Sequence, residues 1–223
     1  MDKQLLMDGV KKFLSGIIMI GLLLFLPAGT IHYYNGWLFC GVLFIPVLIM
    51  GVVLYLKAPE LLRKRLREKE EQAEQKSVVA LSGLMFLAGF ILAGLDFRFG
   101  WTQLPSWLVY AAAVAFLLGY AMFGEVMREN AYLSRTVEVQ ENQEVIDTGL
   151  YGIVRHPMYT ATVVMFLAMP LVLGSAISFV VFFVYPFLIV KRIRNEEQVL
   201  EEGLAGYTEY KQKVKYRLIP FIW

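Results

Sequence analysis

Two polar clusters border the last long apolar stretch of this 223-residue chain. The first is Arg155-His156-Pro157-Met158-Tyr159, and the second consists of Arg192, Glu196 and Glu197. Together they offer an imidazole, a phenol, guanidinium groups and a pair of carboxylates. Such a set can hold a charged cofactor, because guanidinium groups bind anions and carboxylates bind cationic groups. This chemistry requires that the fold bring both clusters to one place.

The amino-acid composition indicates whether the chain folds in water or in a lipid bilayer. Hydrophobic residues make up 58% of the sequence, whereas soluble domains are about 45–50% apolar. We therefore expect a multi-pass integral membrane protein, folded as a single domain because the chain has little length left for a second one. Cys40, the only cysteine, lies in an apolar run. That excludes an intramolecular disulfide and a cysteine-based metal site.

The first half contains four apolar runs, each near the roughly 20 residues that cross a bilayer. They cover residues 13–26, 37–56, 78–95 and 107–123. Lysines precede the first run as in a secretory signal, but a retained first helix followed by a second explains both runs without cleavage. Aromatic residues flank the runs as boundary anchors would; they are Tyr33, Tyr34, Trp37, Trp101 and Trp107. His32 belongs to the same boundary and is interpreted as solvated.

Basic residues predict the orientation of the chain. The loop at residues 57–76 carries seven lysines and arginines, whereas the turn near residue 35 carries none and the turn near residue 99 only one. Basic loops stay on the cytoplasmic side, so we place the N-terminus and this loop there. Acidic and basic residues alternate over 61–75, which predicts a charged surface helix. That helix is interpreted as a contact for anionic lipid headgroups or as a solvated connector.

The apolar stretch at residues 160–190 determines whether the two clusters meet. As a single crossing it would be long, and it would place the basic residues that follow it outside. A helical hairpin that turns at 173–175 avoids both problems, with arms of about 14 to 15 residues and roughly 21 to 23 Å. Pro157 suits the first position of the entering helix. His156 then lies beside a helix N-terminus, which favours anions.

A polar segment at residues 124–155 is the largest non-membrane segment able to wrap a ligand. Thr136-Val137-Glu138-Val139 alternates as a strand does, and Asp147-Thr148-Gly149 has turn chemistry, so we expect a structured loop with a short hairpin. In the second cluster, Glu197 fits a solvated carboxylate paired with basic neighbours such as Arg192 on its own helix. Glu196 fits that interpretation less well.

Taken alone, each motif can be explained without a functional site, because short motifs match by chance. Arg155 and His156 would be a basic flank, and Tyr159 a boundary aromatic. The hairpin that joins the clusters favours a site instead. The C-terminal tail is aromatic and amphipathic at 206–211 and 218–221. It is expected to lie on the membrane and close a pocket, or simply to anchor the C-terminus.

In this order, the motifs resemble the isoprenylcysteine carboxyl methyltransferase family and the related phospholipid methyltransferases. The resemblance covers the C-terminal half from Asn130 onward, and the ordered set is specific where single motifs are not. It is carried by Gly149-Leu150-Tyr151, residues 155–159, Arg192, residues 196–200 and Tyr207-Thr208-Glu209-Tyr210. The apolar runs, the hairpin and the resemblance together predict an all-α integral membrane protein with four spanning helices plus a C-terminal helical hairpin. A cytoplasmic cofactor-binding loop and a C-terminal amphipathic helix complete it, with residues 1–123 as scaffold and 124–223 as the catalytic half.

The same resemblance implies a membrane methyltransferase that uses S-adenosylmethionine. Arg192 would be the catalytic residue and face the methyl acceptor. The implied cofactor-binding residues are Gln143, Glu144, Val145, Ile146, Tyr151, His156, Pro157, Met158, Tyr159 and Glu196. The implied partners are a lipid or lipidated acceptor and the membrane, with neither nucleic acid nor metal. Both termini and the active site would lie on the cytoplasmic side.

Residue chemistry favours a carboxylate acceptor. A carboxylate needs no general base and suits the planar guanidinium of Arg192, whereas an amine needs a base and gains nothing from a nearby cation. The alternatives are a phospholipid N-methyltransferase, an NADPH-dependent sterol or isoprenoid reductase-like protein, and a non-enzymatic protein that keeps the scaffold. Glu138, Glu141 and Glu144 argue against a site for the 2′-phosphate of NADPH.

Overall fold

The computed structural model describes residues 2–66, 73–133 and 139–223, and within these ranges every regular element is helical. The elements in chain order are α1 (Lys3–Ala28), α2 (Tyr34–Lys57), α3 (Pro59–Leu66), α4 (Ala73–Phe99), α5 (Ser106–Glu129), the 3₁₀ helix η1 (Gly149–Gly152), α6 (Pro157–Val172), α7 (Ala176–Phe182), α8 (Tyr185–Gly203) and α9 (Tyr207–Lys213). The predicted all-α membrane fold is confirmed.

The long helices are membrane spans by length and composition. Among the described residues, α1, α2, α4 and α5 are long and apolar enough to cross a bilayer, as is the segment Ala176–Gly203 formed by α7 and α8. Helix α6 is apolar but shorter. The expected four spans followed by a hairpin are therefore present.

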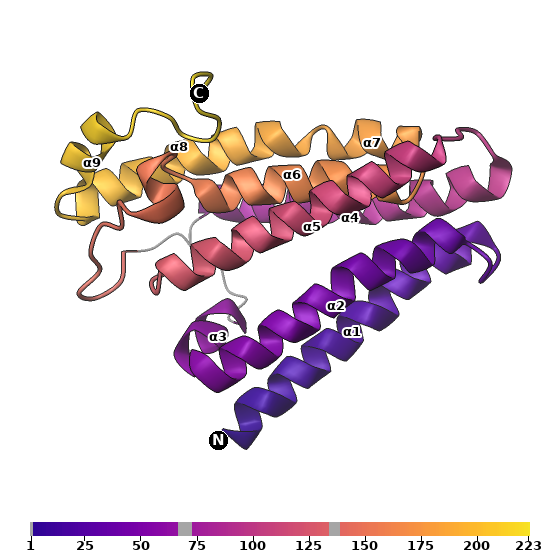
Figure 1. Ribbon diagram of the computed structural model, residues 1–223, viewed down its shortest axis with the longest axis horizontal. Helices are drawn as coiled ribbons and strands as arrows, with labels where there is room; N and C mark the ends of the chain where they lie inside the picture. The colour runs from indigo at the N-terminus through magenta and orange to yellow at the C-terminus, as the bar shows by residue number, and fades with distance from the viewer. Residues whose placement is uncertain (1, 67–72, 134–138) are drawn as a thin grey trace.

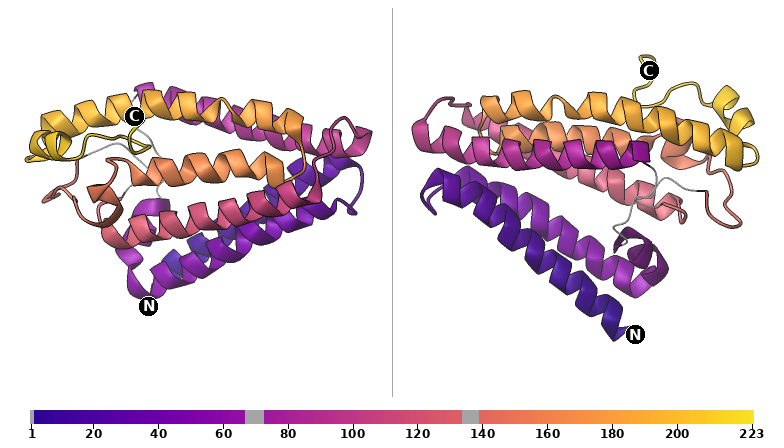
Figure 2. Two further views of the ribbon diagram at one scale, coloured as in Figure 1. Left: turned by 45° about the horizontal axis from the view of Figure 1, so that its top comes forward. Right: turned by 180° about the vertical axis from the view of Figure 1, so that it is seen from behind.

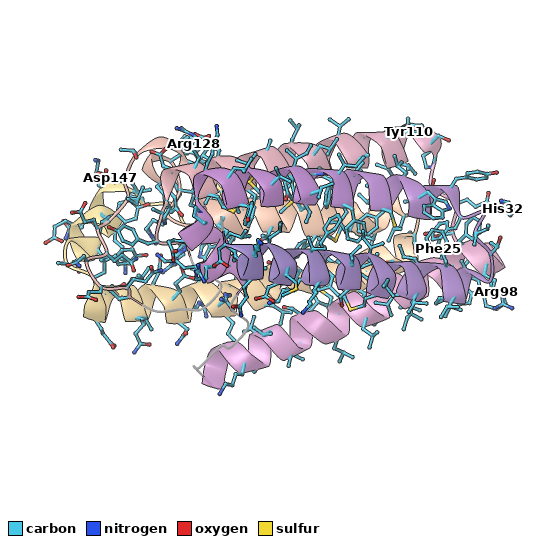
Figure 3. All side chains as sticks on the ribbon, turned by 90° about the horizontal axis from the view of Figure 1, so that it is seen from below. Phe25, His32, Arg98, Tyr110, Arg128 and Asp147 are labelled. Atoms are coloured by element: carbon cyan, nitrogen blue, oxygen red, sulfur yellow. The ribbon has the colours of Figure 1, made fainter. Side chains whose placement is uncertain are left out.

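The helices form two groups that meet at one end of the molecule. Helices α1 and α2 make a hairpin that packs against α4 near the α1–α2 turn and diverges from the other helices toward the N-terminus (Figures 1 and 2). Helices α4 to α8 run side by side, with α6 lying along α5. Arg128 and Asp147 lie at one end of the molecule, and His32 and Arg98 lie at the opposite end (Figure 3).

The hairpin turn between α6 and α7 is where the sequence predicts it. Gly174 adopts a positive φ of 79°, a backbone conformation that glycine tolerates. Ser175 then caps α7 by accepting a hydrogen bond from the Ser178 N–H. Because α7 and α8 together return to the end at which α6 begins, the two polar clusters come together (Figure 1).

Buried polar side chains fix the opposite end of the bundle. The carboxylate of Asp96, only 1% exposed, accepts hydrogen bonds from the Thr102 N–H at 2.7 Å and from the hydroxyls of Thr102 and Ser175. The Tyr33 hydroxyl donates to the Leu173 carbonyl oxygen at 2.6 Å, and the side chain is fully buried. The interpretation of Tyr33 as a boundary anchor is therefore wrong, because its hydroxyl donates a hydrogen bond inside the bundle and not at the lipid boundary.

Three local expectations need correction or lie outside the described residues. Helix α5 continues to Glu129, beyond the apolar run that ends at residue 123. The charged helix expected over 61–75 is described as α3 up to Leu66, and residues 73–75 already belong to the spanning helix α4. Residues 67–72 lie outside the described part of the chain, as do residues 134–138, which hold most of the expected strand.

The α1–α4 contact depends on one glycine. A Cβ atom added at Gly94 would lie 2.5 Å from the Leu24 carbonyl oxygen, a backbone atom that cannot rotate away, whereas one added at Gly83 on the same helix meets nothing within 4 Å. We expect Gly94→Ala to lower the free energy of unfolding by about 1–3 kcal/mol, the usual cost of overpacking. Gly83→Ala should be neutral or stabilising, because alanine is the better helix former. Thermal unfolding in detergent tests both variants, and equal melting temperatures would refute this packing.

Candidate active site

A pocket lies at the end of the molecule where α6 begins and α8 emerges from the bundle. The space between its lining residues, open solvent at its mouth included, is about 840 Å³. Its lining comes from the loop that follows α5, η1, the start of α6, α8 and the C-terminal segment. The lining residues are Asn130, Tyr132, Leu133, Gln143, Glu144, Val145, Ile146, Tyr151, Arg155, His156, Met158, Tyr159, Arg192, Glu196, Leu200, Leu204, Tyr207 and Tyr210.

Glu197 lies behind the pocket and is 3% exposed. Its Oε1 accepts a hydrogen bond from Arg155 Nε at 2.7 Å and lies 3.3 Å from His156 Nε2, and its Oε2 accepts from Arg217 Nε at 2.8 Å. The expectation of a solvated Glu197 paired along its own helix is wrong. Its partners come from the α6 N-terminus and the C-terminal segment. They lie too far from Glu197 in sequence for an i,i+4 rule to predict them.

Arg155 also holds the C-terminal segment in place. Its Nη1 donates to the carbonyl oxygens of Val214 at 2.7 Å and Lys215 at 2.9 Å. The backbone N–H groups of Arg155 and His156 donate to the carbonyl oxygens of residues 216 and 217. The tail therefore packs against the start of α6, and Arg155 is a buried structural cation rather than a basic flank.

Tyr159 links the two polar clusters on the pocket side. Its hydroxyl accepts a hydrogen bond from Arg192 Nε at 2.8 Å and donates one to Glu196 Oε2. His156 Nδ1 lies 3.9 Å from Glu196 Oε1. Consecutive helix residues point about 100° apart, so Glu196 faces the pocket while Glu197 faces the tail.

The far wall of the pocket is a cluster of tyrosines. Asn130 Nδ2 donates to the Tyr151 hydroxyl at 2.9 Å, and the Tyr210 hydroxyl donates to the Tyr151 carbonyl oxygen at 2.8 Å. Burial raises the pKa of Tyr151 to about 12, while the hydrogen bond from Asn130 acts in the opposite direction. Burial, with the nearby charges of Glu197 and Glu196, raises the pKa of Tyr207 well above its ordinary value. These phenols stay neutral and can donate hydrogen bonds at physiological pH.

The structure brings together all but one of the site residues predicted from the sequence. Arg192 and nine of the ten predicted cofactor-binding residues line the pocket: Gln143, Glu144, Val145, Ile146, Tyr151, His156, Met158, Tyr159 and Glu196. Pro157 does not line it; it is buried as the first residue of α6, where its ring suits the start of the helix.

Sequence reasoning missed several lining residues. Asn130 and Tyr132 follow α5 directly, and the apolar side chains of Leu133, Leu200 and Leu204 offered no chemical signal. Tyr207 and Tyr210 belong to the motif that carried the resemblance, but their place in the pocket depends on the folding of the tail. Their spacing of three residues, on one face of a helix, was the available signal.

A second cavity adjoins the pocket and extends between the helices. Apolar and aromatic side chains of α2, α4, α5, α6 and α8 form most of its lining, including Phe86, Phe116 and Phe166. Met158, Tyr159 and Arg192 line both this cavity and the pocket. A polar site and an apolar cavity therefore meet at one phenol and one guanidinium group.

The chain is similar to known membrane enzymes. Residues 108–202 match the family model described as the isoprenylcysteine carboxyl methyltransferase (ICMT) family. The predicted resemblance is confirmed. A solved structure of the eukaryotic intramembrane Ras methyltransferase ICMT aligns with a TM-score of 0.57 at 18% identity, covering 92% of this chain and 74% of that one. This likeness shows a shared fold.

Two curated relatives point to different chemistries. The chain is 31% identical over 91 residues to the Delta(14)-sterol reductase of Mus musculus, a match that spans 40% of this chain and 22% of the reductase. It is 25% identical over 169 residues to protein-S-isoprenylcysteine O-methyltransferase B of Arabidopsis thaliana, spanning 66% of this chain and 81% of the relative. The match to the reductase thus spans about a fifth of that protein's length.

Tyr207 offers a direct test of whether the pocket is built for a ligand. Its hydroxyl is buried and has no hydrogen-bond partner among the described residues, which costs about 1–3 kcal/mol unless a ligand accepts from it. We expect Tyr207→Phe to raise the melting temperature of the ligand-free protein yet weaken binding of S-adenosylhomocysteine about tenfold, the effect of one lost hydrogen bond of about 1.4 kcal/mol. Thermal unfolding with and without the ligand measures both effects.

Tyr210→Phe is the matched control, because its hydroxyl already donates to the Tyr151 carbonyl oxygen. This variant should lower the melting temperature of the ligand-free protein. A Tyr207→Phe variant that is also destabilised, with ligand binding intact, would contradict a ligand-directed hydroxyl.

Proposed function

We propose that this protein transfers a methyl group from S-adenosylmethionine to the carboxylate of a lipid-like acceptor in the membrane. The observation that carries the proposal is the junction of the two cavities at Met158, Tyr159 and Arg192. A water-soluble cofactor fits the polar pocket, and an apolar chain fits the cavity between the helices. The reacting groups would meet where the two cavities join.

The donor set of the pocket suits this cofactor. When bound, S-adenosylmethionine supplies an electrophilic methyl group on a sulfonium centre. Glu196 can accept hydrogen bonds from an ammonium group or a ribose diol, and Tyr207 can donate to a carboxylate or a ring nitrogen. The faces of Tyr151, Tyr159 and Tyr210 attract a cation. The loop residues Gln143, Glu144, Val145 and Ile146 line one side of the pocket.

Arg192 would hold and orient the acceptor carboxylate. Its Nε is bonded to Tyr159, and Tyr159 is bonded in turn to Glu196, so the guanidinium group has a fixed position relative to the cofactor side of the site. A displacement at a methyl group depends on alignment and on exclusion of water. The apolar lining of the cavity excludes water from that side. No residue needs to remove a proton from a carboxylate.

The second candidate function is reduction of a sterol or isoprenoid double bond with NADPH, favoured by the 31% identity to the sterol reductase. The charges of the pocket argue against binding of NADPH. The 2′-phosphate of NADPH calls for arginine or lysine side chains. Among the described residues that line the pocket, the cations Arg155 and Arg192 are bonded to Glu197 and Tyr159, and two carboxylates, Glu144 and Glu196, share the lining.

Two variants separate the roles in methyl transfer. Arg192→Ala should reduce turnover by about ten- to a hundredfold, the effect of losing a charge-assisted hydrogen bond of about 1.5–3 kcal/mol, and leave the Kd for S-adenosylhomocysteine nearly unchanged. Glu196→Gln should weaken that Kd by a similar factor. Calorimetry of detergent-purified protein gives the Kd values, and transfer of a radiolabelled methyl group to an N-acyl amino acid gives the rates. The reverse pattern would refute these roles.

The product identifies the acceptor chemistry. A methyl ester releases radioactive methanol in mild base, whereas a methylated amine does not. Release of the label supports a carboxylate acceptor, whereas base-stable label on a phospholipid amine offered in place of the N-acyl amino acid would favour the phospholipid N-methyltransferase alternative. Stabilisation of the protein by NADPH, without any by the adenosyl compounds, would favour the reductase, because only a ligand of the folded state raises its stability.

A further inference from the structure

The side-chain amide of Asn130 lines the pocket but has no part in the proposed reaction. Asn130 directly follows α5, and its backbone N–H donates to the Val126 carbonyl oxygen. Its Oδ1 accepts a hydrogen bond from the Tyr132 N–H at 2.9 Å, and its Nδ2 donates to the Tyr151 hydroxyl oxygen at 2.9 Å. The amide therefore connects the backbone after α5 to a phenol that also lines the pocket.

The Tyr132 backbone determines which way this amide points. A backbone N–H can only donate, so the group that faces it has to be the amide oxygen. The amide nitrogen is then left to face Tyr151, and an amide nitrogen can only donate as well. The Tyr151 hydroxyl oxygen is therefore the acceptor in this pair. Its own proton has to go to a different group.

The proton of the Tyr151 hydroxyl has no acceptor in the described part of the chain. The hydroxyl takes part in one hydrogen bond there, the one that it accepts from Asn130. The side chain is 8% exposed, and burial raises the pKa of the phenol to about 12, so the proton stays in place. A buried donor without an acceptor is unfavourable. A bound ligand that accepts from Tyr151 would satisfy it.

The surroundings of Tyr151 indicate which kind of ligand group would accept its proton. Tyr151 is buried in a cluster with Leu133, and Ile146 packs against that cluster. The Tyr210 hydroxyl donates to the Tyr151 carbonyl oxygen, and the Tyr210 and Tyr207 rings lie 5.8 Å apart. Such apolar and aromatic side chains pack well against the faces of a flat ring. An uncharged ring system with acceptor nitrogens at its edge fits this side of the pocket.

The side of the pocket that meets the apolar cavity suits the charged part of the cofactor. Methyl transfer requires the sulfonium centre to lie near this junction, which Tyr159 lines. Tyr159 is bonded there to Arg192 and Glu196. Guanidinium and carboxylate groups pair with the carboxylate and ammonium groups of an amino acid. The adenine of S-adenosylmethionine is then left for the side lined by Tyr151.

We propose that Asn130 is a positioning residue for the cofactor: it holds the Tyr151 hydroxyl so that its proton is donated to a ring nitrogen of the adenine. This inference rests on the proposed function, since it takes the pocket as the site of S-adenosylmethionine. Asn130 acts through Tyr151 and need not touch the cofactor itself. It therefore affects the affinity for the cofactor and the choice of base, and not the methyl-transfer step.

Ligands that each lack one ring nitrogen test the proposal. The 1-deaza, 3-deaza and 7-deaza analogues of S-adenosylhomocysteine replace one nitrogen by a CH group and so remove one acceptor. Calorimetry of detergent-purified protein gives their Kd values. With wild-type protein, one of the three should bind about tenfold more weakly than S-adenosylhomocysteine, the effect of one lost hydrogen bond. It should also bind more weakly than the other two analogues.

Variants on either side of the hydrogen bond should remove this difference among the ligands. Tyr151→Phe has no proton to donate. Asn130→Asp provides a carboxylate that accepts the Tyr151 proton in place of the adenine. In the Tyr151→Phe background, Asn130→Asp should change the difference no further.

Asn142→Asp is the matched control for the aspartate variant. It introduces the same charge on an exposed side chain that does not line the pocket. Asn142 has a positive φ of 56°, which aspartate also tolerates. This variant should keep the difference among the ligands.

The melting temperature of the ligand-free protein gives a measurement that needs no cofactor. Asn130→Asp should be less destabilising in the wild-type background than in the Tyr151→Phe background, where the new carboxylate loses its donor. Asn130→Ala leaves the Tyr151 hydroxyl free to rotate, so it should reduce the difference among the ligands without removing it. It replaces the aspartate variant if that variant does not fold.

Equal binding of the three deaza analogues by wild-type protein would overturn the proposal, and is the result expected if Tyr151 donates to a ribose oxygen or to the carboxylate of the cofactor. An Asn130→Asp variant that keeps the wild-type difference would overturn it too, and would reduce Asn130 to a cap of α5. If S-adenosylhomocysteine does not bind at all, the proposed function fails and the adenine fails with it as the acceptor. The melting temperatures would still decide whether Asn130 directs the Tyr151 proton.

Discussion

The carboxylate of Glu197 is the constraint on which the site depends. It is buried, and a buried carboxylate is tolerated only when cations and hydrogen bonds compensate for its lost hydration. Arg155, His156 and Arg217 provide that compensation from two segments far from Glu197 in sequence. Removing any one partner would leave a buried charge partly unmatched, so the four side chains stabilise one arrangement of α6, α8 and the tail.

This arrangement places the groups that face the pocket. Because Glu197 points toward the tail, its neighbour Glu196 points toward the pocket, where it meets the hydroxyl of Tyr159. Tyr159 lies three residues after His156, less than one helical turn into α6. The buried ion pairs therefore determine the register between α6 and α8, and that register determines which side chains line the junction of the two cavities.

Much of this organisation was predictable because membrane folding follows composition and charge. The apolar runs located the spanning helices, and the basic residues after residue 190 required the last stretch to turn back, which brought the two polar clusters to the same end. The side of the membrane on which this end lies stays a prediction. Hydrogen bonds and ion pairs between residues far apart in the chain could not be predicted from the sequence. Local rules assign Glu197 to Arg192 on its own helix and Tyr33 to the lipid boundary, yet both have partners more than 15 residues away.

The surface helix α3 shows how one basic segment can serve several purposes. Basic residues near a spanning helix orient the chain, and that role does not depend on where each side chain points. Successive residues of a helix differ by about 100° in direction, so Arg63, Lys64 and Arg65 contact three different structures: the N-terminal residue Asp2, the loop at Gln140 and the apolar cavity. The orientation signal would survive any exchange of lysine and arginine among these positions.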